Sequence, residues 1–125
     1  MKIRIRGNSI RYRLTRTEVE LLQKTGYIAE HTAFNGAQFT YAIKAVKNLN
    51  ALEANFQKNT ITLLFPLVEN KVWADIDRVG YENKMVLNDG QILKLLLEKD
   101  FVCLDERLED ESDNYPNPAA AKTKS

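Results

Sequence analysis

The feature that most constrains this chain is a pattern of turns, helix caps and apolar positions that occurs twice. Residues 2–14 alternate apolar and charged side chains on either side of a Gly7-Asn8-Ser9 turn, which predicts two short strands or one bent strand. A second alternating stretch, residues 53–65, surrounds Lys58-Asn59-Thr60, 51 positions later. Each half therefore begins with a strand, a turn and a second strand.

Local signals then predict a helix and a hairpin in the first half. Thr15 and Glu18 have the spacing of a capping box, in which each side chain accepts a hydrogen bond from the other residue's backbone N–H. Gly26 is placed to end this helix in the left-handed conformation. Asn35-Gly36 is the strongest hairpin signal in the chain, and it lies between two strand-like stretches.

The second half carries related signals with three residues inserted. Pro66 is expected to open the second helix, since proline is favoured in a first helical turn. Gly80-Tyr81 is matched with Gly26-Tyr27, and Gly90 with the turn glycine Gly36. An apolar stripe at helical spacing is expected on the second helix: Val68, Val72, Trp73 and Ile76.

These patterns predict an α+β fold of two duplicated strand–strand–helix–strand–strand units with two short helices. Their pairing is expected to form a small antiparallel β-barrel or sandwich, which would hide the edges of isolated hairpins. At 125 residues the chain fits one domain. We assign it to residues 1–104, with pseudo-repeats 2–46 and 53–98. Residues 105–125 are expected to form an acidic, extended tail containing prolines.

The net charge of +1 conceals a strong asymmetry between the two ends. Residues 1–16 contain six Lys and Arg residues and no acid, whereas residues 98–113 are mostly acidic. We expect the tail to lie near the basic first strand and mask it, with Tyr115 and Pro116 as an apolar anchor. Such asymmetry is informative about binding partners rather than about the fold.

Little in the sequence points to catalysis, so a non-enzymatic protein is favoured. The single cysteine, Cys103, lies beside acidic residues, which raise a thiol pKa, and a buried inert role is expected. His31 is the only histidine and falls on the polar side of a strand, so no metal site or cofactor is predicted. The acidic residues 106–113 lack the spacing of a calcium loop, which favours a solvated tail over a cation site.

Four arginines carry the sharpest binding hypothesis. Arg4 and Arg6 share a face of the first strand, and Arg11 and Arg13 share a face of the second. Guanidinium groups form bidentate contacts with phosphate, so these residues are candidates for anion or nucleic-acid contact. The alternative is a charged solvent face that prevents an edge strand from aggregating.

Residues 1–15, with a basic strand, a Gly-Asn-Ser turn and an Arg-aliphatic pair before a short helix, resemble the opening of the AbrB/MazE swapped-hairpin barrel family. This resemblance implies dimerised units of similar strand and helix order, with DNA bound through the basic N-terminal region. A fused pair in one chain would fit the duplication. The family's Pro-Gly-Asp turn is missing here, and the second copy of this segment, residues 53–65, carries only Lys58 as a base.

A second resemblance covers nearly the whole chain. Together with the N-terminal segment, residues 96–105 and 112–118 are similar to a family of short Bacteroidota proteins of unknown function. We therefore expect a bacterial binding or adaptor domain for a protein or small-molecule ligand, with a DNA-binding regulator as the alternative. One cysteine fits a reducing cytoplasm, and no apolar run approaches the ~18 residues of a membrane helix.

Overall fold

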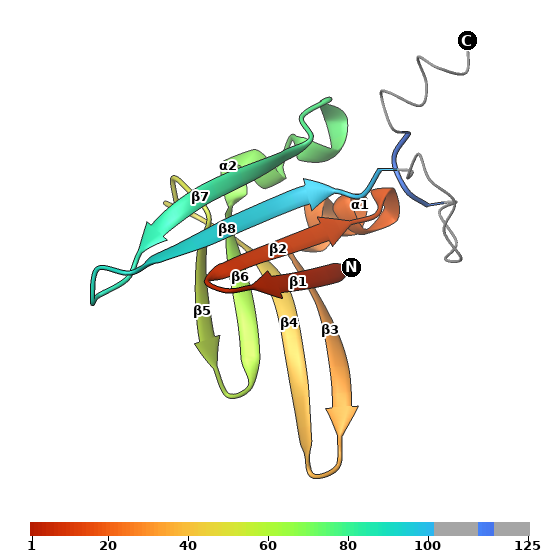
Figure 1. The fold of residues 1–125 in the computed structure, drawn as a ribbon. Helices are drawn as coiled ribbons and strands as arrows, with labels where there is room; N and C mark the ends of the chain where they lie inside the picture. Colours follow the sequence, from red (N-terminus) through yellow and green to blue (C-terminus); the bar gives the residue numbers. More distant parts are fainter. Residues whose placement is uncertain (102–112, 117–125) are drawn as a thin grey trace.

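The computed structural model describes residues 1–101 and 113–116 and contains two four-stranded sheets with short helices at one end (Figure 1). One sheet has the order β1-β2-β8-β7 and the other β3-β4-β6-β5. The strands are β1 (Lys2–Arg6), β2 (Ser9–Leu14), β3 (Tyr27–Phe34), β4 (Ala37–Val46), β5 (Glu53–Gln57), β6 (Thr60–Pro66), β7 (Gly80–Val86) and β8 (Ile92–Lys99). The helices are α1 (Arg16–Thr25), α2 (Leu67–Asn70) and the 3₁₀-helix η1 (Trp73–Asp75).

The local signals of the first half produce the predicted elements. The Thr15 hydroxyl accepts from the Glu18 backbone N–H, and Glu18 Oε1 accepts from the Thr15 N–H at 2.9 Å, which completes the capping box. Gly26 ends α1 at φ +74°, a conformation that costs glycine little. Asn35-Gly36 forms the two-residue turn between β3 and β4.

Each sheet combines one hairpin from each half of the chain. Hairpin β1–β2 pairs with β7–β8 through a parallel β2–β8 contact, and β5–β6 pairs with β3–β4 through a parallel β4–β6 contact. The predicted α+β class is confirmed, but the all-antiparallel arrangement is wrong. Parallel neighbours need a long connection. Between β2 and β8 it contains all the strands of the other sheet, and between β4 and β6 it contains residues 47–52 and the edge strand β5. Within the described residues the two sheets remain separate and form no closed barrel.

The two halves have the same pairing register with small shifts. The pairs Ile3–Tyr12 and Ala54–Leu63 differ by 51 positions on both strands. In the parallel pairs, β2 and β6 are again related by 51 positions, whereas β4 and β8 are related by 54. Between β3 and β7 the shift is 53, so Tyr81 corresponds to Ile28 rather than to Tyr27.

Gly80 is therefore not the counterpart of Gly26, and the predicted match is wrong by one residue. Gly80 lies in β7 without a positive φ, whereas Gly26 caps a helix. A Cβ at Gly80 would lie 2.2 Å from the carbonyl oxygen of Leu97 on the neighbouring strand. Glycine is required here because the backbone of β8 approaches too closely for any side chain.

We expect Gly80→Ala to lower the free energy of unfolding by about 2–3 kcal/mol, because the obstructing atom is backbone and cannot rotate away. Urea unfolding followed by circular dichroism measures this change. Glu82→Ala, an exposed position on the same strand, should stay within about 0.5 kcal/mol of the wild type. Equal stability of the Gly80→Ala variant would contradict the close approach.

The second helix is shorter than predicted, and the expected apolar stripe does not form. α2 ends at Asn70, and the chain continues through a separate 3₁₀ turn at Trp73. Residues on the two pieces therefore do not share one helical face. Of the four stripe residues only Trp73 is buried, while Val68, Val72 and Ile76 are exposed. Pro66 is the last residue of β6 and the N-cap of α2, so it opens the second helix as Thr15 opens the first.

The inner faces of both sheets and the helices share one hydrophobic core. Buried side chains come from both sheets and from the helical end: Tyr12, Leu14, Val19, Leu22, Ile28, Ile43, Leu52, Ile61, Leu63, Phe65, Trp73, Tyr81, Leu95 and Leu97. The Tyr12 hydroxyl donates to the Ile61 carbonyl oxygen at 3.2 Å and so joins β2 to β6. Burial raises the pKa of Tyr12 well above its usual value. The other face of each sheet is turned away from this core.

Candidate anion-binding surface

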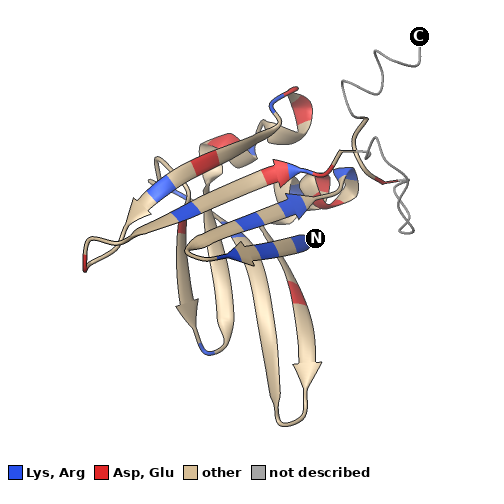
Figure 2. Cartoon of the chain, viewed as in Figure 1, with Lys and Arg blue, Asp and Glu red and all other residues tan. Residues whose placement is uncertain are grey.

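The outer face of the β1-β2-β8-β7 sheet carries a dense group of cations, which we call the cationic face. Blue ribbon segments mark Lys and Arg positions on all four strands of this sheet in Figure 2. The β-sheet register assigns seven cations and two acids to this one face. They are Lys2, Arg4, Arg6, Arg11, Arg13, Lys84 and Lys94, with Glu82 and Glu98.

Strand register joins the two arginine pairs that the sequence placed on separate strands. Arg4 lies directly opposite Arg11, and Lys2 lies opposite Arg13. Directly paired residues project to the same side of a sheet, so all four predicted arginines share the outer face. The alternate positions Tyr12 and Leu14 turn inward and are fully buried. The period of two therefore makes one side of this sheet a core face and the other a cationic face.

Ion pairs engage some of these cations and leave others available. Glu98 Oε1 lies 3.1 Å from Arg11 Nε and 3.7 Å from Arg13 Nε, so one carboxylate serves both arginines. Lys2 Nζ lies 3.0 Å from the buried Asp100 carboxylate. Within residues 1–101 and 113–116, Arg4 and Arg6 form no ion pair, and both are exposed. These two guanidinium groups are the strongest candidates for an external anion.

The equivalent positions of the other sheet hold no cation. The 51-residue shift maps the five bases of β1 and β2 onto residues of β5 and β6. Arg4 and Arg6 correspond to Asn55 and Gln57, and the remaining three bases correspond to Glu53, Thr62 and Leu64. β5 is an edge strand, as β1 is, yet it carries no positive charge. Protection of an edge alone does not account for five cations on only one of two equivalent hairpins.

The cationic face has only shallow depressions between its arginines. One, of about 140 Å³, is lined by Arg4, Arg6, Ser9 and Arg11. Another, of about 190 Å³, lies around Lys2, Arg4, Arg11 and Arg13. Pockets for drug-sized ligands usually measure roughly 300–1,000 Å³. A third depression, of about 350 Å³, is lined by Glu82, Asn83, Lys84 and Lys94 and reaches the lower end of that range. The arginine-lined part of the face is therefore better suited to an extended anion lying across it than to an enclosed small molecule.

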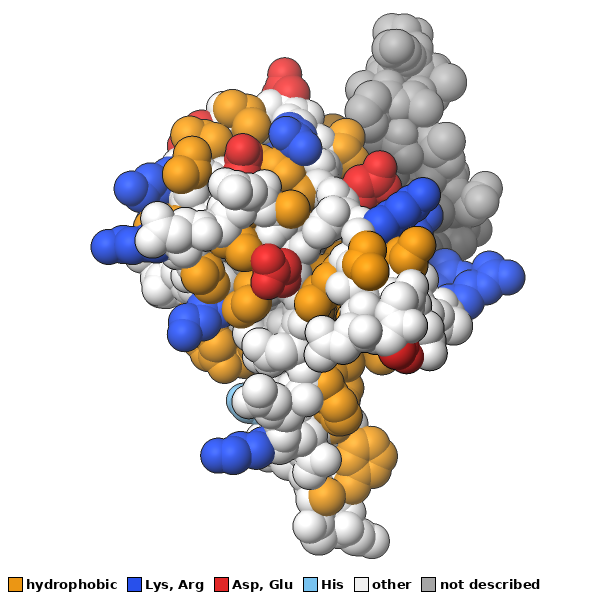
Figure 3. Space-filling view, turned by 90° about the vertical axis from the view of Figure 1, so that its left-hand side faces the viewer, with side chains coloured by type: hydrophobic (Ala, Val, Ile, Leu, Met, Phe, Trp, Pro, Cys, Tyr) orange, Lys and Arg blue, Asp and Glu red, His pale blue; other side chains and the backbone are white. Residues whose placement is uncertain are grey.

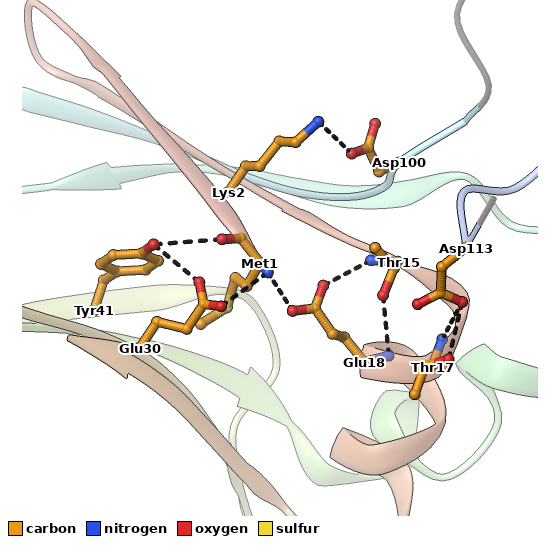
Figure 4. A network of polar contacts seen from close by, with 9 residues as sticks. All are labelled: Met1, Lys2, Thr15, Thr17, Glu18, Glu30, Tyr41, Asp100 and Asp113. Atoms are coloured by element: carbon orange, nitrogen blue, oxygen red, sulfur yellow. Dashed lines mark hydrogen bonds and ion pairs between the residues drawn. The ribbon is translucent and has the colours of Figure 1, made fainter. Parts of the chain in front are cut away.

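A polar network fixes the start of β1 against α1 and the other sheet (Figure 4). The buried Met1 ammonium contacts the Glu18 carboxylate and lies 3.4 Å from Glu30 Oε1. The Tyr41 hydroxyl donates to Glu30 Oε2 at 2.9 Å. Burial, together with this carboxylate, raises the pKa of Tyr41 to about 12. Glu18 thus both caps α1 and holds the strand that carries Arg4 and Arg6.

The described part of the tail, residues 113–116, is anchored at the start of α1 rather than over the four arginines. Asp113 Oδ1 accepts from the Thr17 hydroxyl at 2.9 Å (Figure 4), and the Asp113 backbone carbonyl oxygen accepts from the Arg16 N–H at 3.1 Å. Hydrogen bonds from Thr15 and Thr17 lower the pKa of the Asp113 carboxyl. The described tail residues contact Arg16 and none of Arg4, Arg6, Arg11 or Arg13.

Tyr115 forms the main side-chain contact of this tail segment. Its ring lies 5.7 Å from that of Phe101 and 5.4 Å from the Arg16 guanidinium, and its N–H donates to the Asp100 carbonyl oxygen at 2.7 Å. The anchor proposed from the sequence therefore lies in a packed position, and Pro116 borders the depression beside it. Tail residues 105–112 and 117–125 lie outside the described residues, so masking by the acidic segment stays a prediction.

Sequence reasoning missed Lys99, which is almost completely buried. Its Nζ donates to the Ile76 carbonyl oxygen at 2.6 Å and lies 5.7 Å from the Trp73 ring centroid and 5.0 Å from that of Tyr115. Burial lowers the pKa of Lys99. It borders a depression of about 500 Å³. The period of two through Leu93, Leu95 and Leu97 places Lys99 on the core face, but a lysine at the end of a strand is normally expected in solvent.

His31, the single histidine of the sequence, lies on β3 among polar side chains. His31 Nδ1 lies 2.8 Å from Thr40 Oγ1 and 3.0 Å from Gln38 Nε2, so it takes part in a local hydrogen-bond cluster. Residues 1–101 and 113–116 contain no group of three or more His, Cys, Asp or Glu arranged to hold a metal ion. None of their helices is long and apolar enough to span a membrane. Cys103 lies outside the described residues.

These features define a small α+β protein with exchanged hairpins and a cationic sheet face. The chain belongs to DUF7009, a family of unknown function whose model matches residues 1–119. The sequence-based expectation of a near full-length match to such a family is confirmed. No curated protein and no solved structure matches the chain.

Proposed function

We propose that this protein binds a polyanion, with the phosphate backbone of a nucleic acid as the ligand, through the cationic face. The observation that carries the proposal is the contrast between equivalent hairpins. Five bases lie on β1 and β2, and none lies at the matching positions of β5 and β6. Lys84 and Lys94 extend the positive charge across the sheet to β7. The sequence alternative of DNA binding is thus favoured over an enclosed small-molecule site.

The chemistry of the face suits phosphate recognition. Arg4 and Arg6 are exposed and two residues apart on β1, so their side chains project to the same side at a spacing of roughly 7 Å. Guanidinium forks bind phosphate oxygens in bidentate geometry. Phosphate contacts of this kind give affinity without reading base sequence. The resemblance of residues 1–15 to the AbrB/MazE opening supports the same ligand.

We further infer that the two halves arose by duplication and that only the first kept or acquired a binding role. The shared hairpin exchange and the common 51-residue register shift support this origin. The fold would then tolerate loss of the cations from β5–β6, because outer-face residues contribute little to the core. A nucleic-acid role would place the protein in the cytoplasm, and a single cysteine fits that reducing compartment.

Fluorescence anisotropy with labelled DNA of mixed sequence, single-stranded and duplex, tests the proposal. We expect dissociation constants of roughly 10⁻⁶–10⁻⁴ M at moderate salt, the range of non-specific binders, with little dependence on sequence. A neutral oligosaccharide of similar length serves as the control ligand and should not bind. Absence of DNA binding at low salt would exclude the proposed function.

A further inference from the structure

Strand β3 is the least protected edge in the two sheets, and we propose that it pairs with β3 of a second copy to form a symmetric dimer. The proposal is independent of the cationic face. β3 lies at the end of its sheet, and its last four residues, 31–34, are all exposed. An exposed edge presents unpaired backbone donors and acceptors, which another strand can satisfy.

The other three edge strands carry charges that oppose such pairing. β1 has three cations, β7 has Glu82 and Lys84, and β5 has Glu53 with Lys58 in the following turn. Charged edges are a common device against association between sheets. β3 has only Glu30, which is held near the body of the protein by Tyr41 and the Met1 ammonium. The outer half of β3 lacks this protection.

The hairpin formed by β3 and β4 extends away from the core and exposes apolar surface. Figure 1 shows this hairpin as the longest projection of the molecule, and Figure 3 shows hydrophobic side chains along one side of the projection. Phe34 is 63% exposed at the tip of β3. The half-buried Phe39 lies on β4 opposite Thr32, on the same face as Phe34. A monomer leaves Phe34 mostly exposed and Phe39 partly exposed.

The absence of charge on the β3–β4 hairpin favours a second copy of this chain as the partner that pairs with β3. Residues 32–43 contain no Lys, Arg, Asp, Glu or His. In a symmetric interface each surface meets its own copy, so any charge near the axis would face a like charge. An uncharged hairpin with an exposed phenylalanine, Phe34, meets this requirement. Antiparallel pairing of the two β3 strands would continue the sheet across both copies and place both Phe34 side chains on one continuous sheet face.

The contact is short, so the dimer should be weak. About four exposed residues of β3 from each copy, with Phe34 among them, form the proposed interface, which is at the small end of specific interfaces. We expect a dissociation constant on the order of 10–100 μM, typical of a reversible contact rather than an obligate one. The folded monomer stays intact because the core lies elsewhere.

Sedimentation equilibrium of the full chain over a concentration range spanning this constant tests the proposal. Phe34→Lys and, on the opposite face of the same strand, Ala33→Lys should each leave only monomer, because both bring like charges together across the axis. Phe56→Lys is the matched control: Phe56 is 65% exposed at the opposite edge of the same sheet, and its variant should dimerise as the wild type does. Circular dichroism checks that all three variants fold.

Hydrogen exchange gives a second readout that does not depend on any variant. Amides of residues 31–34 should become more protected as the protein concentration rises, while those of β5 should not change. A wild-type chain that is monomeric at every concentration would overturn the proposal. This holds also if β3 is then found to bind an extended segment of another protein. A dimer that persists in both β3 variants would also overturn it.

Discussion

Reversing the charge of Arg4 and Arg6 together, as Arg4→Glu/Arg6→Glu, should weaken DNA binding roughly 100-fold. Both guanidinium groups are exposed and form no ion pair in the described part of the chain, so the substitution removes no internal contact. The change alters the face by four units of charge. At about 0.7 kcal/mol per unit, within the range for exposed charges, this gives roughly 100-fold. Anisotropy titration at low salt measures the loss.

The matched control has the same net charge change at a different place. Lys44 and Lys47 are exposed near the end of β4, in the other sheet, and Lys44→Glu/Lys47→Glu should reduce affinity less than about 5-fold. Both double variants should unfold at wild-type urea concentrations, since all four positions are on the surface. Equal losses of affinity in the two variants would show that DNA binding depends only on the net charge of the protein and that no specific face binds it.

The largest loss of stability should follow from Trp73→Ala, about 3–5 kcal/mol. The Trp73 ring is almost fully buried and lies edge-to-face against Phe65 at 5.6 Å and Tyr81 at 5.5 Å. Its Nε1–H donates to the Arg78 carbonyl oxygen at 2.9 Å, so truncation leaves both a cavity and an unpaired acceptor. This residue joins the short η1 helix to both sheets.

Urea unfolding measures the effect of Trp73→Ala. It is followed by circular dichroism of the backbone, a signal that does not depend on tryptophan. Domains of this size have roughly 5–15 kcal/mol of total stability, so the variant should be close to unfolding in water at body temperature. Val68→Ala is the control, because Val68 is 75% exposed on the neighbouring α2, and its variant should stay within about 0.5 kcal/mol of the wild type. Similar stability of both variants would place Trp73 outside the core.

Local chemistry made much of the first half predictable from sequence. The capping box at Thr15 and Glu18, the left-handed stop at Gly26 and the Asn35-Gly36 turn depend on neighbouring residues only, and each forms as expected. The alternation of β1 and β2 likewise determined which residues face the core. Tyr12 and Leu14 are buried because their strand has one apolar side, a property that the sequence shows directly.

Features that depend on contacts between distant segments were not predictable in the same way. The parallel β2–β8 and β4–β6 pairs join residues far apart in the chain, and nothing local favours them over an antiparallel arrangement. The one-residue shift at Gly80 follows from a longer β7–β8 turn, which the glycine spacing concealed. The stripe from Val68 to Ile76 has helical spacing, yet the helix ends at Asn70. Its residues therefore do not share one helical face.

The candidate site was predictable in its residues but not in its extent. Charge and spacing identified Arg4, Arg6, Arg11 and Arg13. That all four lie on one face of the sheet could be seen only from the β1–β2 register. Lys84 and Lys94 belong to the same face only because β7 and β8 come from the other half of the chain. Glu98 could not be assigned to Arg11 and Arg13 without the parallel β2–β8 pairing.

The salt dependence of duplex DNA binding, compared between the wild type and Arg4→Gln/Arg6→Gln, tests the cationic face most directly. Each phosphate contact contributes about 0.9 to the slope of log K against log salt concentration. If both arginines contact phosphate, the wild-type slope should be steeper than that of the variant by about 1.8. Parallel lines for the two proteins would contradict the account, since Arg4 and Arg6 would then take no part in binding.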